Sequence, residues 1–143
     1  MAKHPHIRNI ISVNNVLLAR IISLNNINKE YKTQFFSNEE EILQCGIINY
    51  DKKLKPKFHQ HYKVNRNIYG TSEALYILSG EATLQVSESK DHPIYSEKIT
   101  TGDLVNLIEG AHRILPDNSD LLMIEIKNGP YVSQNNDKFY FQR

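Results

Sequence analysis

The chain has 143 residues, of which 40% are hydrophobic and 23% charged, and these values fit one compact domain with a single core. The formal net charge is +1, so no strong overall field is available to attract nucleic acid or an anionic membrane. The single cysteine, Cys45, excludes an internal disulfide and a cysteine-based zinc site. The N-terminal residues lack an apolar stretch of signal-peptide length. We therefore expect one cytoplasmic domain, residues 1–143, that binds neither nucleic acid nor membrane.

Short apolar or alternating segments separated by turn residues dominate the sequence, and this pattern predicts an all-β fold with little helix. Turns are indicated at Ser79-Gly80-Glu81, at Thr101-Gly102-Asp103 and at Asn128-Gly129-Pro130. Many short strands at close spacing favour a barrel or a sandwich. The predicted strands, in chain order, are Val16–Ile22, Gln34–Phe36, Ile42–Tyr50, Lys57–Lys63, Ala74–Ser79, Ala82–Ser87, Tyr95–Ile99, Leu104–Ile108, His112–Leu115 and Leu121–Lys127.

The N-terminal third gives three expectations. The segment Ile7–Lys32 is compatible with a strand, a short helix or both. Within it, Ile10–Leu24 carries more exposed-looking apolar residues than a monomer of this size needs, so we predict a homodimer. Further on, the run Glu39-Glu40-Glu41 predicts a solvated turn. Cys45 follows among apolar residues, which predicts a buried and chemically inert thiol.

A pair of histidines lies in the predicted strand Lys57–Lys63. Residues two apart in a strand point to the same face, so His59 and His61 form a potential chelating pair. Glu73 begins the next predicted strand, and His112 is a third histidine further along. Two or three imidazoles with one carboxylate are a usual ligand set for Fe, Mn, Ni or Zn. The alternative is that the paired histidines are simply exposed or hydrogen-bonded.

The order of these residues resembles the two conserved motifs of the cupin superfamily. In the first motif a His-x-His pair is followed by Glu, six residues and Gly, which His59, His61, Glu73 and Gly80 match. The second motif resembles the stretch from Gly102 to His112. The resemblance implies a double-stranded β-helix, the cupin jelly-roll barrel, with its motif-bearing core at about residues 58–127. It also implies a divalent metal ion bound by a set of four ligands: His59, His61, Glu73 and His112.

The sequence departs from the cupin motifs at three places. The loop Tyr62–Ser72 is longer than usual, and we expect it to edge the mouth of the pocket. Ile108 replaces a proline. One residue separates Gly110 from His112 where the family has two, and a slip of one residue reverses the face of a strand residue. Either a bulge restores His112 as a ligand, or three protein ligands remain and Arg113 occupies the position of the histidine.

Other residues extend the candidate site. Lys63 and Arg66 would hold a substrate carboxylate or phosphate if they face the mouth, or else form a solvated basic loop. Tyr76 and Arg113 are further candidate substrate contacts, although a tyrosine in a strand is an ordinary packing residue. Glu125 is a buried candidate base if its face of the strand Leu121–Lys127 lines the lumen, and polar surface if it does not.

Three functions are compatible with these residues. The first is an enzyme whose divalent metal ion acts on a small polar, sugar-like or carboxylated substrate. The second is a metal-free sugar-nucleotide isomerase or epimerase, to which the chain bears a looser resemblance, with His59 or His61 as the acid/base group. The third is a non-catalytic module that binds a metal ion or a small ligand. The stretch Glu125–Tyr131 also resembles the end of some small bacterial cupins.

Overall fold

The computed structural model describes residues 6–27, 30 and 32–142, and this part of the chain is all-β with very little helix, as predicted. It includes a short 3₁₀ turn, η1 (Leu24–Asn26), and one helical turn, α1 (Gln134–Asp137). No helix in the described ranges is long and apolar enough to cross a membrane. The strands are β1 (Ile7–Ile11), β2 (Leu17–Ser23), β3 (Gln34–Phe35), β4 (Gly46–Ile47), β5 (Glu73–Ser79), β6 (Glu81–Ser87), β7 (Tyr95–Thr100), β8 (Asp103–Leu107), β9 (Ala111–Pro116) and β10 (Leu122–Lys127).

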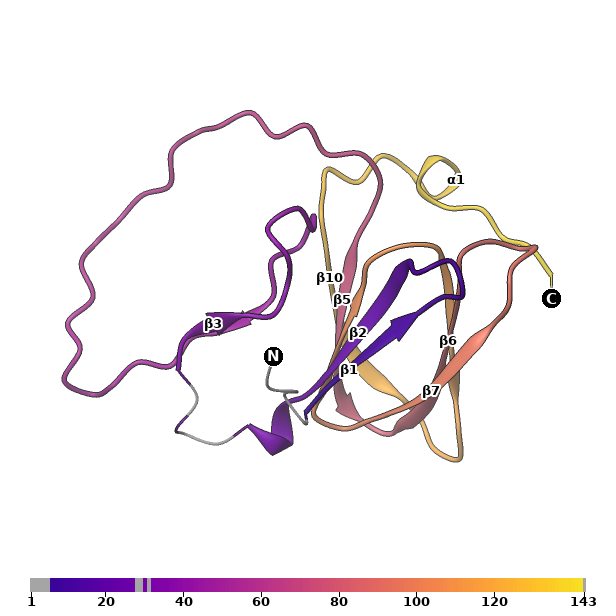
Figure 1. The fold of residues 1–143 in the computed structure, drawn as a ribbon, viewed down its shortest axis with the longest axis horizontal. Coiled ribbons are helices and arrows are strands. Elements are labelled where there is room, and N and C mark those ends of the chain that lie inside the picture. Colours follow the sequence, from indigo (N-terminus) through magenta and orange to yellow (C-terminus); the bar gives the residue numbers. More distant parts are fainter. Residues whose placement is uncertain (1–5, 28–29, 31, 143) are drawn as a thin grey trace.

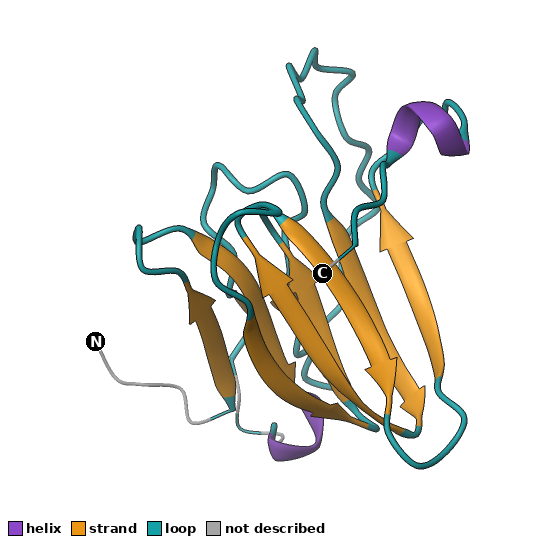
Figure 2. Ribbon diagram, turned by 90° about the vertical axis from the view of Figure 1, so that its right-hand side faces the viewer, coloured by secondary structure: helices purple, strands orange, loops and turns teal. Residues whose placement is uncertain are grey.

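Two antiparallel sheets face each other across the core (Figures 1 and 2). The larger sheet has the order β1-β2-β8-β5-β10, and the smaller has the order β7-β6-β9. The sequence suggested a hairpin at Gly80, but β5 and β6 belong to different sheets and do not pair, so Gly80 instead forms a turn that connects the two sheets. The predicted turn at Gly102 joins β7 to β8. Strands β3 and β4 form a separate two-stranded ribbon.

Alternation along the strands divides core residues from outer residues, as expected for sheets with one buried face. Buried apolar side chains from both sheets form the core: Ile10, Leu18, Ala19, Ile21, Leu75, Ile77, Ala82, Leu84, Val86, Ile99, Val105 and Leu107. Between its buried neighbours Ala19 and Ile21, Arg20 points to the opposite, outer face of the larger sheet. Asn106 lies beside it in β8 and shares that face.

The segment Ile7–Lys32 contains both elements allowed by its pattern, strands β1 and β2 followed by the turn η1, as far as its residues are described. Most of its apolar residues are buried, since β2 lies inside the larger sheet between β1 and β8. The expectation that Ile10–Leu24 offers an exposed apolar surface is therefore wrong, and only Ile11 and Val13 are substantially exposed there. The homodimer itself stays a prediction without that support.

Two predicted strands are not formed as expected. In Ile42–Tyr50 only β4 is a strand, and Lys57–Lys63 has no regular secondary structure. Residues 51–70, called the histidine loop from here, are all exposed and arch away from the sheets (Figure 1). Alternation alone does not make a strand, because a strand needs at least one hydrogen-bonded neighbouring strand. Among the described strands, β9 pairs only with β6, and β10 only with β5, so the two sheets remain open along this side.

Candidate functional site

Glu73 and His112 meet at one end of the core, where the two sheets begin to separate. Glu73 starts β5 on the same face as buried Leu75, and His112 lies opposite buried Val86 in the ladder between β9 and β6. Both side chains therefore project between the sheets. His112 Nε2 lies 3.2 Å from Glu73 Oε2, and the two side chains are 37% and 13% exposed. The pair is thus held by rigid strands and remains open to solvent.

The inward direction of His112 follows from the turn at Gly110. This glycine has a φ of 81°, and a Cβ at its position would collide with the carbonyl oxygen of Ser87. The following ladder is regular from Ala111 to the end of β9, without a bulge. The shortened turn therefore leaves His112 on the inner face. Arg113 points to the outer face, where its Nε donates a hydrogen bond of 2.6 Å to Gln85 Oε1.

The environment of Glu73 favours the ionised carboxylate. A hydrogen bond from His112 lowers the pKa of Glu73, and this effect together with nearby positive charge from Lys127 and Lys138 outweighs partial burial, which raises it. Glu73 is therefore an acceptor, with its second oxygen available for another partner. An ionised carboxylate beside an imidazole nitrogen can share either a proton or a metal ion.

A second group of charges surrounds this pair. Lys127 lies opposite Glu73 in the ladder between β10 and β5, and its Nζ is 3.2 Å from Asp137 Oδ2 and 3.7 Å from Glu125 Oε1. The hydrogen bond to Asp137 raises the pKa of Lys127. Lys127 also lies over the ring of Tyr131, 5.4 Å from its centroid. Two carboxylates, Glu125 and Asp137, already neutralise Lys127. Its ammonium group therefore holds these side chains at the rim and has little charge left to attract an anion.

Sequence reasoning missed Lys127 and Asp137. The signal for Lys127 was its spacing of two and four residues from Glu125 and Met123, which puts all three on one face of β10. In the ladder with β5, Lys127 lies opposite Glu73 on that face. Asp137 had no such signal, because it comes from the isolated turn α1 beyond the last strand.

Of the predicted site residues on strands, Glu125 lies on the inner face of its sheet, whereas Tyr76 and Arg113 lie on outer faces. Of the two alternatives for Glu125, the inner face is correct, but its side chain is 49% exposed and so it is not a buried carboxylate. Tyr76 alternates with Leu75 and Ile77 and so lies on the outer face, as Arg113 does on the other sheet. Neither Tyr76 nor Arg113 shares the space between the sheets with Glu73, and their contact with a substrate stays a prediction.

The paired histidines lie on the histidine loop and not on a strand. The ring centroids of His59 and His61 are 5.3 Å apart, and both side chains are exposed, as are those of Lys63 and Arg66. Within the described ranges, no three His, Cys, Asp or Glu residues are grouped closely enough to hold a metal ion. The structure thus assembles two half-sites, His59 with His61 and Glu73 with His112, and does not bring them together.

The end of the histidine loop is nevertheless fastened beside Glu73. Ser72 is buried, its Oγ donates a hydrogen bond of 2.8 Å to the carbonyl of Leu107, and its N–H donates to Asn128 Oδ1 at 2.8 Å. Asn128 Nδ2 in turn donates to the carbonyl of Gly70 at 3.2 Å. This end of the expected mouth loop, Tyr62–Ser72, therefore does border the rim.

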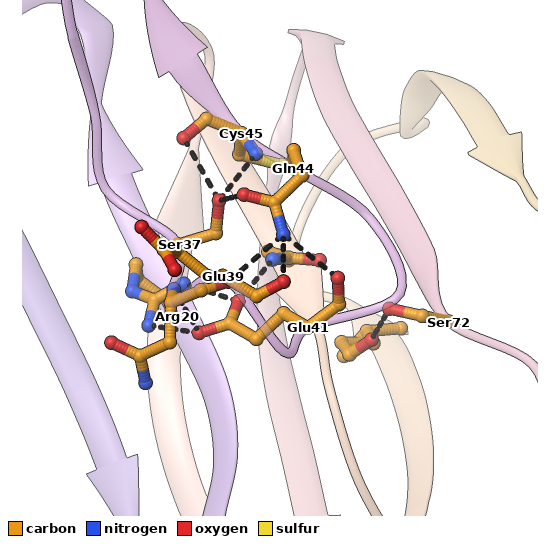
Figure 3. Close-up of polar contacts among 10 residues, drawn as sticks. Arg20, Ser37, Glu39, Glu41, Gln44, Cys45 and Ser72 are labelled. Atoms are coloured by element: carbon orange, nitrogen blue, oxygen red, sulfur yellow. Dashed lines mark hydrogen bonds and ion pairs between the residues drawn. The ribbon is translucent and has the colours of Figure 1, made fainter. Parts of the chain in front are cut away.

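A different polar cluster lies on the outer face of the larger sheet (Figure 3). Arg20 Nη1 and Nη2 each donate a hydrogen bond of 2.8 Å to the carboxylate of Glu41, and both side chains are buried. Burial raises the pKa of Glu41, but the hydrogen bonds from Arg20 and the Asn38 N–H outweigh it, so the pKa of Glu41 is lowered. The expectation that Glu39-Glu40-Glu41 is a wholly solvated turn is wrong for its last residue.

This cluster is structural. Gln44 Nε2 donates to the carbonyls of Asn38, Glu39 and Glu41, which fixes the loop that carries the buried carboxylate. Cys45 is buried as predicted, and burial raises the pKa of its thiol. A thiol with a raised pKa is a poor nucleophile, so the prediction of an inert cysteine stands.

A shallow hollow at the opposite end of the sheets is lined by charged residues that pair with one another. Arg8 contacts Glu97 at 2.9 Å, and Lys98 contacts Asp117 at 2.7 Å. Both positively charged residues of the lining, Arg8 and Lys98, are thus already paired with carboxylates.

Comparison with known protein families, with curated proteins and with solved structures finds no match to this chain. The resemblance to cupins therefore rests on its motif residues alone.

Proposed function

We propose that the protein binds a divalent metal ion at the rim between Glu73 and His112 and acts on a small polar substrate. The observation that supports the proposal is the 3.2 Å contact between His112 Nε2 and Glu73 Oε2, on facing strands and accessible to solvent. Metal binding would replace the shared proton, since a ligand imidazole must be neutral at the coordinating nitrogen. One imidazole and one carboxylate suit Fe, Mn, Ni or Zn, as the sequence resemblance also implies.

The resident pair supplies only part of a ligand set, so the donors present fit a metal ion in part. His59 and His61 are two more imidazoles on one exposed loop, and they complete the set if the loop reaches the rim. A bound ion supplies Lewis-acid chemistry to a coordinated substrate oxygen. Glu125, half-exposed on the inner face, is the group placed to accept a substrate proton at the same rim. A sugar-like or carboxylated molecule offers the oxygen donors that such a site requires.

A metal-free acid/base function is the second candidate, and the same contact favours it. Glu73 orients His112 without any ion, and an oriented imidazole is a general base for isomerisation or epimerisation. In this candidate His112 takes the role that the sequence suggested for His59 or His61, because those two side chains are exposed and have no orienting carboxylate among the described contacts.

Metal binding by the untagged protein tests the first candidate. Titration with Mn²⁺ or Zn²⁺, with elemental analysis, should give a stoichiometric site in the wild-type protein. Glu73→Gln and His112→Ala should each weaken affinity by about tenfold or more, since removing even an outer-shell partner of a metal ligand costs about 10–100-fold. The matched control is Arg113→Ala, the next residue on the opposite face of β9. It should bind as the wild type does.

The result also separates the candidates. A wild-type protein that binds no ion, or a His112→Ala variant with unchanged affinity, contradicts the metal site. If the protein binds no ion but turns over a nucleotide sugar and loses this turnover on His112→Ala, the acid/base candidate replaces it.

A further inference from the structure

Charge is distributed unevenly between the histidine loop and the rest of the chain. The loop contains six of the 17 Lys and Arg residues but only one of the 16 Asp and Glu residues. Its net charge is therefore +5, whereas the rest of the chain has a net charge of −4. The expectation that the protein binds no nucleic acid rested on the overall charge of +1, which conceals this separation.

The positive charges of the loop are available to a partner. The whole loop is exposed and arches away from the more acidic sheets (Figure 1). Elsewhere Arg20 and Lys127 are paired with carboxylates. By contrast, no ion pair between described residues includes a cation of the loop. These cations are Lys52, Lys53, Lys55, Lys57, Lys63 and Arg66. The loop therefore favours an anionic partner.

Aromatic side chains are interleaved with these charges. Phe58 follows Lys57, and Tyr62 precedes Lys63. Phe58, Tyr62 and Tyr69 are almost completely exposed and take no part in the core. Rings of this kind provide platforms on which bases stack, while neighbouring cations contact the phosphates of the same strand.

We propose that the histidine loop is a binding surface for single-stranded nucleic acid. Its cations contact the phosphates, and the exposed rings stack on unpaired bases. This chemistry is common to RNA and DNA. The inference goes beyond the proposed function and does not depend on it, because it uses neither Glu73 nor His112.

An unpaired strand suits the loop better than a duplex does. In a duplex the bases are stacked on one another and only their edges are accessible in the grooves, so Phe58 and Tyr62 would find no base face. The major groove admits a helix or a two-stranded ribbon, and the loop has no regular secondary structure. Every unpaired base, in contrast, offers a face for stacking.

An anionic membrane is the less suitable partner. From Lys55 to Tyr69, no backbone N–H donates a hydrogen bond to another described residue. Such groups are costly in the apolar part of a bilayer, whereas backbone N–H groups are common donors to phosphate oxygens. Apolar residues such as Leu54 and Ile68 are also separated by lysines and amides, so the loop lacks the continuous apolar face of an interfacial segment.

Fluorescence anisotropy with the full-length protein tests the proposal. The probes are labelled oligouridylate and oligothymidylate of about 20 nucleotides, a length that exceeds the site size of a typical single-strand-binding domain. We expect a Kd of about 1–100 μM at about 0.15 M salt, the range of binding without sequence preference. A duplex of the same length should bind more weakly. Tighter binding of the RNA probe would identify RNA as the partner, because only RNA offers a 2′-hydroxyl.

Two loop variants test the two kinds of contact. Lys55→Gln with Lys57→Gln should weaken binding and make the dependence of log K on log salt shallower by about 1.4, since each phosphate contact contributes about 0.7 on a single strand. The matched control removes the same charge from the smaller sheet, with Lys90→Gln and Lys98→Gln, and should leave the slope unchanged.

The aromatic variant is Phe58→Ala with Tyr62→Ala. It should weaken binding about fivefold or more for each ring, which corresponds to the lower end of the stacking contribution per base. The matched control is Phe139→Ala with Tyr140→Ala, an exposed Phe and Tyr beyond the last strand, and it should bind as the wild type does.

Four results overturn the inference. The first is no binding of either single-stranded probe at protein concentrations up to about 0.1 mM, the weak limit of binding without sequence preference. The second is equal weakening by the loop variants and their matched controls, which would place the contacts outside the loop. The third is binding of the duplex as tight as that of the single strands. The fourth is binding to vesicles of phosphatidylserine and phosphatidylcholine in place of both probes, which would make a membrane the partner.

Discussion

Two ionic pairs of this molecule use the same kind of chemistry in opposite surroundings. Arg20 and Glu41 lie on the outer face of the larger sheet, where the loop before Cys45 covers them and both side chains are buried. His112 and Glu73 lie between the sheets at the rim, where the imidazole is 37% exposed. In the first pair, two hydrogen bonds join Arg20 to both carboxylate oxygens of Glu41. In the second pair, the contact involves only His112 Nε2 and Glu73 Oε2, so the second oxygen of Glu73 and the second ring nitrogen of His112 take no part in it.

The difference distinguishes a pair that stabilises the fold from one that is available for chemistry. Removing one member of a buried pair leaves an uncompensated charge inside the protein. Removing the more exposed member of a partly exposed pair lets water replace it, so the cost to stability is small. We therefore expect that breaking the Arg20–Glu41 pair lowers stability and leaves metal binding unchanged. Breaking the Glu73–His112 pair should weaken metal binding and change stability little.

The largest effect on stability is expected for Glu41→Gln. The buried guanidinium of Arg20 then lacks its counter-charge, and the free energy of unfolding should fall by about 3 kcal/mol, the lower end for a broken buried pair because the loop can move and admit water. Urea unfolding measures this change. The exposed neighbour Glu40 supplies the control, since Glu40→Gln should change stability by less than about 0.5 kcal/mol. Equal stability of Glu41→Gln and the control would contradict a structural role for the outer pair.

The pH dependence of stability should also depend on the Glu41 carboxylate. The pKa of Glu41 is lowered in the folded protein from its ordinary value of 4.5, so its ionised form stabilises the fold above that pH. This contribution is lost as the pH falls through the folded-state pKa. Urea unfolding followed from pH 6 to about pH 3 should therefore show a shallower acid loss for Glu41→Gln than for the wild type. Parallel curves for the two proteins would show that Glu41 titrates as it does in the unfolded chain.

Loss of the rim pair is expected to change stability much less than loss of the outer pair. His112→Ala should lower the free energy of unfolding by no more than about 1 kcal/mol in metal-free protein, because the pair with Glu73 is partly solvated. Chemical denaturation with a chelator present measures this, and the weakened metal affinity of the same variant completes the contrast with Glu41→Gln. If His112→Ala unfolds the metal-free protein, the rim pair is structural and the distinction between the two pairs fails.

Parity along single strands was predictable from the sequence, and in the ladder with β5 it places Glu125 on the same face as Met123, opposite Leu75 and Ile77. The direction of His112 was not, because it depends on the backbone at Gly110 and not on the spacing of residues. The partner of Arg20 could not be predicted from the sequence either. A charged residue inside the apolar β2 requires a buried partner, yet nothing in Glu39-Glu40-Glu41 marks the third glutamate as that partner.

The histidine loop shows the other limit of sequence patterns. Its alternation of Phe58, Gln60 and Tyr62 with the two histidines is typical of a strand, but a strand also requires a neighbouring edge, which depends on contacts distant in the sequence. The elements that did form as predicted, such as β5 and β6, are joined by a tight turn, pair with other strands of their own sheets and bury one face in the core.

A crystal structure of the wild-type protein with Mn²⁺, in which the anomalous signal locates the ion, would show directly whether Glu73 and His112 bind a metal ion. The account predicts an ion coordinated by His112 Nε2 and a Glu73 carboxylate oxygen at about 2.0–2.2 Å, with His59 and His61 brought to the same ion. An ion bound elsewhere, more than about 5 Å from both His112 and Glu73 and so well beyond any coordination distance, would contradict it.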